Sequence, residues 1–147
     1  MLKRLLTTSD DRIQLLLRLT LGLAMFPHGG QKLLGWFGGY GFTGTMGFMT
    51  GMGMPAVLAF LVIMGESLGA VGLIVGFVTR FCAFGILMIM VGAVALVHFK
   101  YGFFMNWSGQ GAGEGYEYHL IVAGLALALM IRGGGSLSVD RVIQDRV

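Results

Sequence analysis

Residues 55–101 read PAVLAFLVIMGESLGAVGLIVGFVTRFCAFGILMIMVGAVALVHFKY and hold only three charged residues. The hydrocarbon core of a bilayer is about 30 Å thick, so about 20 helical residues cross it. The stretch is long enough for two crossings, 55–77 and 79–101, with little more than Val78 between them. Pro55 suits the first turn of a helix, where its missing N–H costs little. The sequence therefore predicts a tight hairpin of two membrane-spanning helices.

The composition of the whole chain agrees with a membrane protein. The chain has 147 residues, of which 56% are hydrophobic and 12% are charged, against about 25% charged in soluble domains. We therefore expect a lipid bilayer as the solvent. The net charge of +3 comes from scattered basic residues, and without a basic stripe we expect no nucleic-acid partner. The single cysteine, Cys82, excludes an internal disulfide.

Two further apolar segments, 12–34 and 116–131, flank the central hairpin. Together with it they predict an all-α fold, an antiparallel four-helix bundle of up-down-up-down connectivity in one domain over 1–147. The glycine-rich segments 35–54 and 102–115 are expected to be loops on the outward side.

The two ends of the chain carry weaker helix signals. Thr8 is predicted to cap the first span, with Asp11 completing a variant of the capping box. The tail 138–147 has the pattern of a short amphipathic helix on the membrane surface, or of a frayed end. The apolar run after Lys3 and Arg4 is too short for a signal peptide, so we expect these residues to be retained.

The distribution of Lys and Arg predicts the orientation. If both termini lie on one side, seven basic residues fall on that side and two on the other. By the positive-inside rule both termini are then cytoplasmic. The first set is Lys3, Arg4, Arg12, Arg80, Arg132, Arg141 and Arg146, and the second is Lys32 and Lys100.

Glycines recur at helical spacing inside the spans. In the second span they share one face, which allows close approach of a neighbouring helix, or of another subunit. The same interpretation extends to the third and fourth spans. The positions are Gly65, Gly69, Gly72 and Gly76, then Gly85 with Gly92, and Gly124 with Ala128. GYGFTG at 39–44 matches the G-x-G-x-x-G pattern of dinucleotide-binding folds, but no predicted strand precedes it. We therefore do not expect a dinucleotide site there.

Two ionisable residues lie inside the predicted spans. Such groups are costly in lipid and indicate function or a buried partner. If His28 and Pro55 mark the same boundary, Arg18 and Glu66 lie at one depth. We therefore predict that Arg18 pairs with Glu66, as a proton relay or as a structural ion pair.

The three histidines, His28, His98 and His119, all fall at the outward ends of the predicted spans. With Glu66 or Glu117 they could form a metal site, and two of them could bind a haem. They could also donate hydrogen bonds to a quinone head group walled by aromatic rings. These rings belong to Phe26, Trp36, Phe37, Phe103, Phe104 and Trp107.

Two other interpretations of these residues stay open. The aromatic residues are also typical of an interfacial belt, where single histidines are tolerated. Methionine thioethers can bind copper(I), although methionine is more often apolar filler. The methionines of the first outward segment are Met46, Met49, Met52 and Met54.

The order of the polar motifs resembles the DoxX family of small bacterial four-helix inner-membrane proteins. The motifs are R-x-x-x-G (Arg18, Gly22), F-P-H-G-x-x-K (Phe26 to Lys32), G-E-x-x-G (Gly65 to Gly69), G-x-x-T-R (Gly76 to Arg80), a histidine before G-F-F (His98, Gly102 to Phe104), E-Y-H (Glu117 to His119) and S-x-D-R (Ser138 to Arg141). The resemblance implies a relation to the DoxD subunit of thiosulfate:quinone oxidoreductase. By position it implies these candidate site residues: Arg18, His28, Lys32, Glu66, Arg80, His98, Glu117 and His119.

These observations lead to two main hypotheses. The first is a redox-associated component, such as a membrane oxidoreductase subunit, that binds a quinone or another small ligand at the outward end. The second is a non-enzymatic scaffold in a homo-oligomer or a membrane redox complex. A transporter is a weaker alternative, because four spans without an internal repeat offer a small pathway.

Overall fold

The computed structural model describes residues 5–146, and no strand occurs among them. Lys3 and Arg4, which entered the charge count above, lie outside the described residues. The helices are α2 (Arg12–Leu34), η1 (Trp36–Gly38), α3 (Gly41–Gly51), α4 (Ala56–Val75), α5 (Thr79–Ala93), α6 (Glu117–Arg132) and α7 (Val139–Gln144). After α5 the helical path continues through a π-helical turn, Val94–His98, and a 3-10 turn, Phe99–Tyr101.

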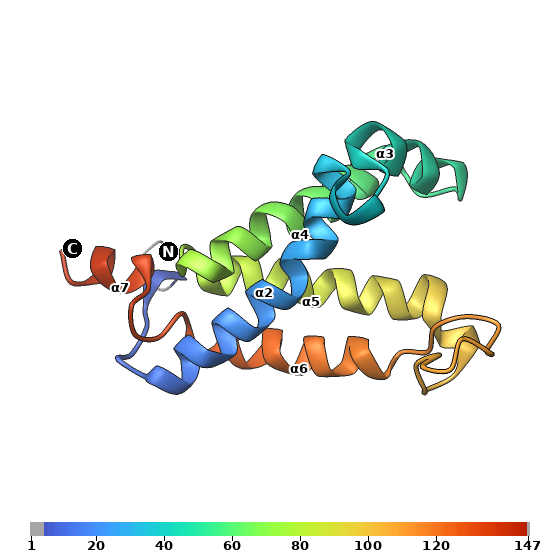
Figure 1. The fold of residues 1–147 in the computed structure, drawn as a ribbon. Helices are drawn as coiled ribbons and strands as arrows, with labels where there is room; N and C mark the ends of the chain where they lie inside the picture. Colours follow the sequence, from blue (N-terminus) through green and yellow to red (C-terminus); the bar gives the residue numbers. More distant parts are fainter. Residues whose placement is uncertain (1–4, 147) are drawn as a thin grey trace.

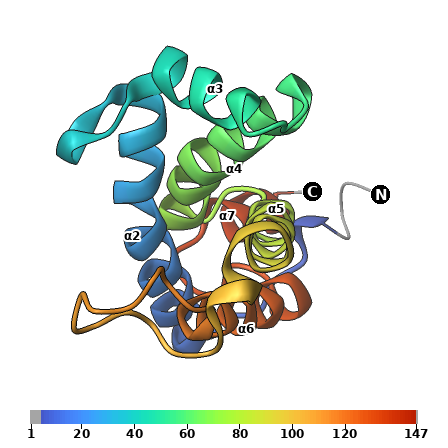
Figure 2. The same ribbon diagram turned by 90° about the vertical axis from the view of Figure 1, so that its right-hand side faces the viewer.

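Four long helices form the body of the molecule (Figures 1 and 2). In chain order, α2 packs on α4, α4 on α5 and α5 on α6, and α2 also touches α6. α7 lies at one end, while α3 and the 102–116 loop lie at the opposite end. We call these the terminal end and the outer end. Small and medium apolar side chains fill the centre: Leu21, Met25, Ala70, Leu73, Ala83, Ile86, Met90, Val122, Ala126 and Leu129.

Two glycines of α2 determine how it sits against α4. A Cβ atom on Gly22 would lie 2.8 Å from the side chain of Ile74, and one on Gly29 would lie 2.6 Å from the Cα of Ser67. The Ser67 hydroxyl donates to the carbonyl of Gly29 at 3.1 Å. The outer part of α2 is therefore level with the middle of α4. The assumption that His28 and Pro55 mark one boundary was wrong, because α4 extends beyond α2 at the outer end.

The glycine face of α4 is covered within the same chain. A Cβ on Gly65 would meet Ile89, and a Cβ on Gly72 would meet Cys82. Both of these partners belong to α5, so this face is closed by α5 and not by another subunit. In the other spans no helix of this chain packs closely on the glycines, because added Cβ atoms on Gly85, Gly92 and Gly124 would meet nothing within 4 Å; contact of these glycines with another subunit stays a prediction.

The N-terminus of α2 is capped by Asp11, not by Thr8. The Asp11 carboxylate accepts a hydrogen bond from the N–H of Ile13 at 2.8 Å. Thr8 lies before the helix, where its hydroxyl accepts from the N–H of Gly135 at 2.6 Å and its own N–H donates to Gln144 at 2.7 Å. The predicted capping box failed because tertiary contacts to the C-terminal segment engage Thr8 instead.

Part of the predicted 35–54 loop is helical. α3 covers Gly41–Gly51 and packs on both α2 and α4, with Thr45 buried. Its four glycines and three threonines in eleven residues disfavour a helix in isolation, so packing against the part of α4 beyond α2 explains why it forms. The GYGFTG letters therefore cover the start of α3 and have no phosphate-binding context.

Among the described residues, two helical segments are long and apolar enough to cross a membrane, Ala56–Val75 and Thr79–Tyr101. They are the two halves of the central hairpin. α6 has 16 residues and is about 24 Å long, and α2 carries Arg18 and Lys32 inside its length. α6 is thus shorter than the thickness of a bilayer core, and the two charged residues lower the hydropathy of α2.

Candidate functional site

Arg18 does not pair with Glu66. Its side chain, 1% exposed, donates hydrogen bonds to backbone carbonyls at the terminal end. The shortest go to Leu73 at 2.8 Å and Ile74 at 2.5 Å, at the last turn of α4. Others reach the segment before α7, at Gly134, Ser136 and Leu137. The prediction was wrong because the contact of Gly22 with Ile74 places Arg18 beside the end of α4, not beside its middle.

Asp140 completes the terminal end from α7. This side chain, 1% exposed, accepts from the N–H groups of Val78 at 2.6 Å and Thr79 at 2.8 Å. These are the unpaired donors at the N-terminus of α5, where a carboxylate also suits the helix dipole. The tail is therefore neither frayed nor purely amphipathic. The S-x-D-R motif was the available signal, but its role as a cap for a distant helix is tertiary information.

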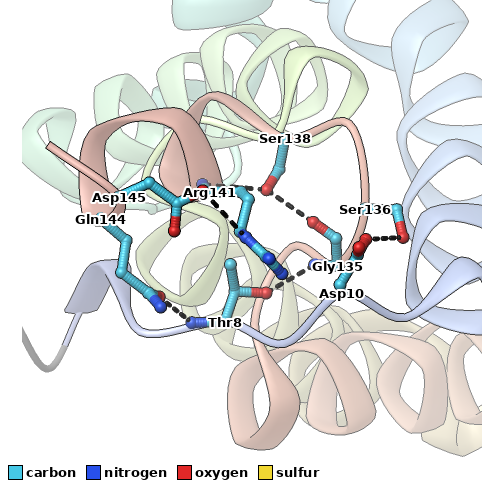
Figure 3. A network of polar contacts seen from close by, with 8 residues as sticks. All are labelled: Thr8, Asp10, Gly135, Ser136, Ser138, Arg141, Gln144 and Asp145. Atoms are coloured by element: carbon cyan, nitrogen blue, oxygen red, sulfur yellow. Dashed lines mark hydrogen bonds and ion pairs between the residues drawn. The ribbon is translucent and has the colours of Figure 1, made fainter.

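Hydrogen bonds around α7 connect the two ends of the chain (Figure 3). Ser138 caps α7 by accepting from the N–H of Arg141, and its hydroxyl donates to the carbonyl of Gly135. Ser136 donates to Asp10 at 2.7 Å. Arg80, a candidate site residue by resemblance, donates to the carbonyls of α6 at Met130 and Ile131 and to Thr7. These side chains thus pair with backbone groups near helix ends, while the Gln14 Oε1 and the Thr79 Oγ1 at the same end are buried without a partner.

Glu66 takes Lys32 as its partner. The Lys32 Nζ lies 2.5 Å from the Glu66 Oε2, and the two side chains are 24% and 6% exposed. The pair links the outer part of α2 to the middle of α4. Sequence reasoning named both residues but did not pair them.

His98 and His119 lie against each other at the outer end. Their ring centroids are 4.0 Å apart, at an interplanar angle of 38°. The His98 Nδ1 lies 2.8 Å from the carbonyl oxygen of Glu114, and since a carbonyl can only accept, this nitrogen carries the proton. His119 is buried, and its Nδ1 has no hydrogen-bond partner.

His28 and Tyr118 connect this histidine pair to the ion pair. The ring centroids of His28 and Tyr118 are 6.2 Å apart, and those of Tyr118 and His119 are 5.8 Å apart. His28 lies one helical turn before Lys32 on α2, and its side chain is exposed on the flank of that helix. The Tyr118 hydroxyl has a weak contact, 3.9 Å to the sulfur of Met25. The outer polar cluster is Lys32, Glu66, His28, Tyr118, His119 and His98.

Three predicted site residues make their contacts elsewhere. Glu117 accepts a hydrogen bond from the indole N–H of Trp107 at 2.9 Å. The ring of Trp36 packs edge-on against Phe26 at 6.2 Å. Phe104 lines a separate hollow of about 350 Å³ in the 102–116 loop. Tyr118 was missed as a cluster member, although it stands between Glu117 and His119 in the quoted motif.

Among residues 5–146, no group of three or more His, Cys, Asp or Glu side chains is placed to hold a metal ion. The cluster instead offers a buried ring nitrogen and a phenol hydroxyl, which are hydrogen-bonding groups suited to an uncharged polar ligand.

The DoxX family model matches residues 13–99, which include α2, the Lys32–Glu66 pair and most of the central hairpin. The chain belongs to the DoxX family. This DoxX protein is 29% identical over 126 residues to the "Putative oxidoreductase CatD" of Bacillus subtilis (strain 168), covering 86% of the chain and 83% of the relative. It is 30% identical over 112 residues to the "Inner membrane protein YqjF" of Escherichia coli (strain K12), covering 76% of the chain and 82% of the relative.

No solved structure matches this DoxX protein with significance. The family match and the two apolar helices identify a helical membrane protein. The resemblance that the ordered motifs indicated is confirmed.

Proposed function

We propose that the chain crosses the bacterial inner membrane four times, through α2, α4, α5 and α6, with both termini in the cytoplasm. The chain order of these helices and the common location of Thr8 and Gln144 support this arrangement. The excess of Lys and Arg predicted for the side that holds the termini supports the orientation. The relative named an inner membrane protein supports the location.

Within this bundle, the outer polar cluster binds the head group of a quinone, as part of a redox-associated membrane component. The observation that carries the proposal is the Nδ1 of His119, which is buried without a partner. An unsatisfied buried polar atom costs about 1–3 kcal/mol, and a ligand carbonyl or hydroxyl would remove that cost. The relative named as an oxidoreductase supports a redox role.

The neighbouring residues have distinct roles in this proposal. Tyr118 supplies a hydroxyl whose present partner is only a thioether sulfur. The proton on the His98 Nδ1 is held by a backbone carbonyl, so this ring is kept in one tautomer beside His119. Lys32 neutralises Glu66, which keeps a lone carboxylate out of an apolar region. The exposed flank at His28 gives a lipid-soluble ligand lateral access from the bilayer.

The test is quinone binding by protein purified in native lipid. Organic extraction should release quinone from the wild-type protein in near-stoichiometric amount, and much less from His119→Phe. After delipidation, a short-chain benzoquinone should raise the melting temperature of the wild type. Absence of quinone from native preparations, together with no thermal shift, would refute the proposal.

A second candidate function, an assembly subunit, is favoured by the outward face of α5. Only 17% of the most apolar window of Thr79–Tyr101 is buried inside the protein, and space is open beside Gly85 and Gly92. Small residues let another membrane helix approach closely. Crosslinking from Gly85→Cys in native membranes should give a discrete adduct if a partner, or a second copy, covers this face. A lipid-facing α5 would give none.

A further inference from the structure

The chain carries no Asp, Glu, Lys, Arg or His between Lys32 and Glu66. This interval contains η1 and α3, which connect two long helices at the outer end. A water-exposed connection of that length ordinarily carries charges, as the 102–116 loop does with Glu114. The absence of charge therefore distinguishes η1 and α3 from the other connection at the same end.

Large apolar side chains are also exposed along η1 and α3. They include aromatic rings on both sides of the glycines that end η1, and they continue to the last residues of the segment. The exposed set is Trp36, Phe37, Tyr40, Phe42, Phe48 and Met52. In water, an uncharged segment with this many exposed apolar side chains would be unfavourable unless something covers them.

The packing of α3 on a membrane-spanning helix indicates what covers these exposed side chains. The ring of Phe42 packs edge-on against Phe60 at 6.3 Å, and Phe60 lies in the second turn of α4, one of the two helices apolar enough to span a membrane. On α4 the neighbouring side chains of Val57 and Leu61 are themselves exposed. The apolar surface of α3 thus continues directly into that of α4.

We propose that η1 and α3 form an interfacial helix embedded in the membrane leaflet at the outer end. α3 has 11 residues and is about 16 Å long, which is too short to cross a bilayer. It lies on the flank of α2 and α4 with its aromatic rings among lipid headgroups and upper acyl chains, where aromatic side chains are favoured. The occupant of this apolar face is lipid.

The two tryptophans of the chain provide a matched test. Trp36 is in η1, while Trp107 is in the 102–116 loop and is 84% exposed. The single-tryptophan variants Trp107→Phe and Trp36→Phe are reconstituted in vesicles of phosphatidylcholine and phosphatidylglycerol. Phosphatidylcholine brominated near the headgroup end of its acyl chains should quench Trp36 several-fold more than Trp107, and aqueous iodide should show the reverse order.

A second measurement keeps the test valid if a tryptophan variant folds poorly. In a Cys82→Ala background, Met52→Cys and Ser108→Cys place one thiol in each connection. A membrane-impermeant maleimide should label the thiol at 108 at least tenfold faster than the thiol at 52. Equal labelling, or quenching of Trp36 by iodide, would overturn the proposal. Protection of Trp36 from both quenchers would also overturn it, because protein and not lipid would then cover the face.

Discussion

The charged and histidine side chains at the two ends of the helical body differ in how many hydrogen bonds they make. At the terminal end, Arg18, Asp140 and Arg80 are directed at unpaired backbone groups of helix ends, and each makes at least two hydrogen bonds. At the outer end, Glu66 has one partner, and the Nδ1 of His119 has none. A charged group with several partners stabilises the fold, while the unpaired ring nitrogen of His119 leaves capacity for a ligand. The neutral Gln14 Oε1 and Thr79 Oγ1 at the terminal end are also buried without a partner. The comparison predicts that substitutions at the two ends affect different properties.

The largest effect should come from Arg18→Met. The substitution leaves carbonyls of α4 and of the segment before α7 without a donor, and it removes the positive charge that acts on Asp140. We expect a loss of about 3–5 kcal/mol in the free energy of unfolding, measured by denaturation in mixed micelles. Arg12→Met, at an exposed position of the same helix, should change it by less than about 0.5 kcal/mol. Similar values for both variants would contradict a structural role for the hydrogen bonds of Arg18.

Asp140→Asn should have the next largest effect. The amide keeps one acceptor for the N–H groups of Val78 and Thr79 but loses the charge at the N-terminus of α5. Hydrogen bonds to charged groups contribute about 1.5–3 kcal/mol, so we expect a stability loss in that range. The control is Asp145→Asn, whose carboxylate is 60% exposed and pairs with Arg141; it should be nearly neutral.

Lys32→Met should destabilise the protein less, by about 1–2 kcal/mol, because Lys32 is partly exposed. The loss arises from the Glu66 carboxylate left without its partner. Adding Glu66→Gln should recover most of it, since the double variant buries no unpaired charge. A double variant as unstable as the sum of the two single variants would show that the pair is not coupled.

Much of the helix layout was predictable, because apolar run length is a local property. The segments expected over 12–34 and 79–101 correspond to α2 and to α5 with its two continuing turns. The partners of Arg18 and Glu66 were not predictable from helix ends, because the close approach of Gly22 and Gly29 to α4 sets the depth of α2. Gly22 and Gly29 are seven residues apart and share one helical face, so that spacing was the neglected signal.

Two other features required tertiary information. The glycines of α3 made a loop the natural prediction for this segment. The helix forms because α4 extends beyond α2 and provides a surface on which α3 packs. Asp140 caps a helix that begins about sixty residues earlier in the chain. By contrast, the three histidines were expected at one end from span boundaries alone, and the adjacency of the rings of His98 and His119 agrees with that location. Binding of a ligand by them stays a prediction.

The separation of ligand binding at the outer end from stability at the terminal end can be measured by comparing His119→Phe with Asp140→Asn in one thermal-shift experiment with a short-chain benzoquinone. His119→Phe removes an unpaired nitrogen, so its melting temperature without quinone should stay near that of the wild type, while its quinone-induced shift should disappear. Asp140→Asn should melt at a lower temperature without quinone and keep the full shift. Quinone binding at His119 would be contradicted if His119→Phe kept the shift, or if the wild type showed none.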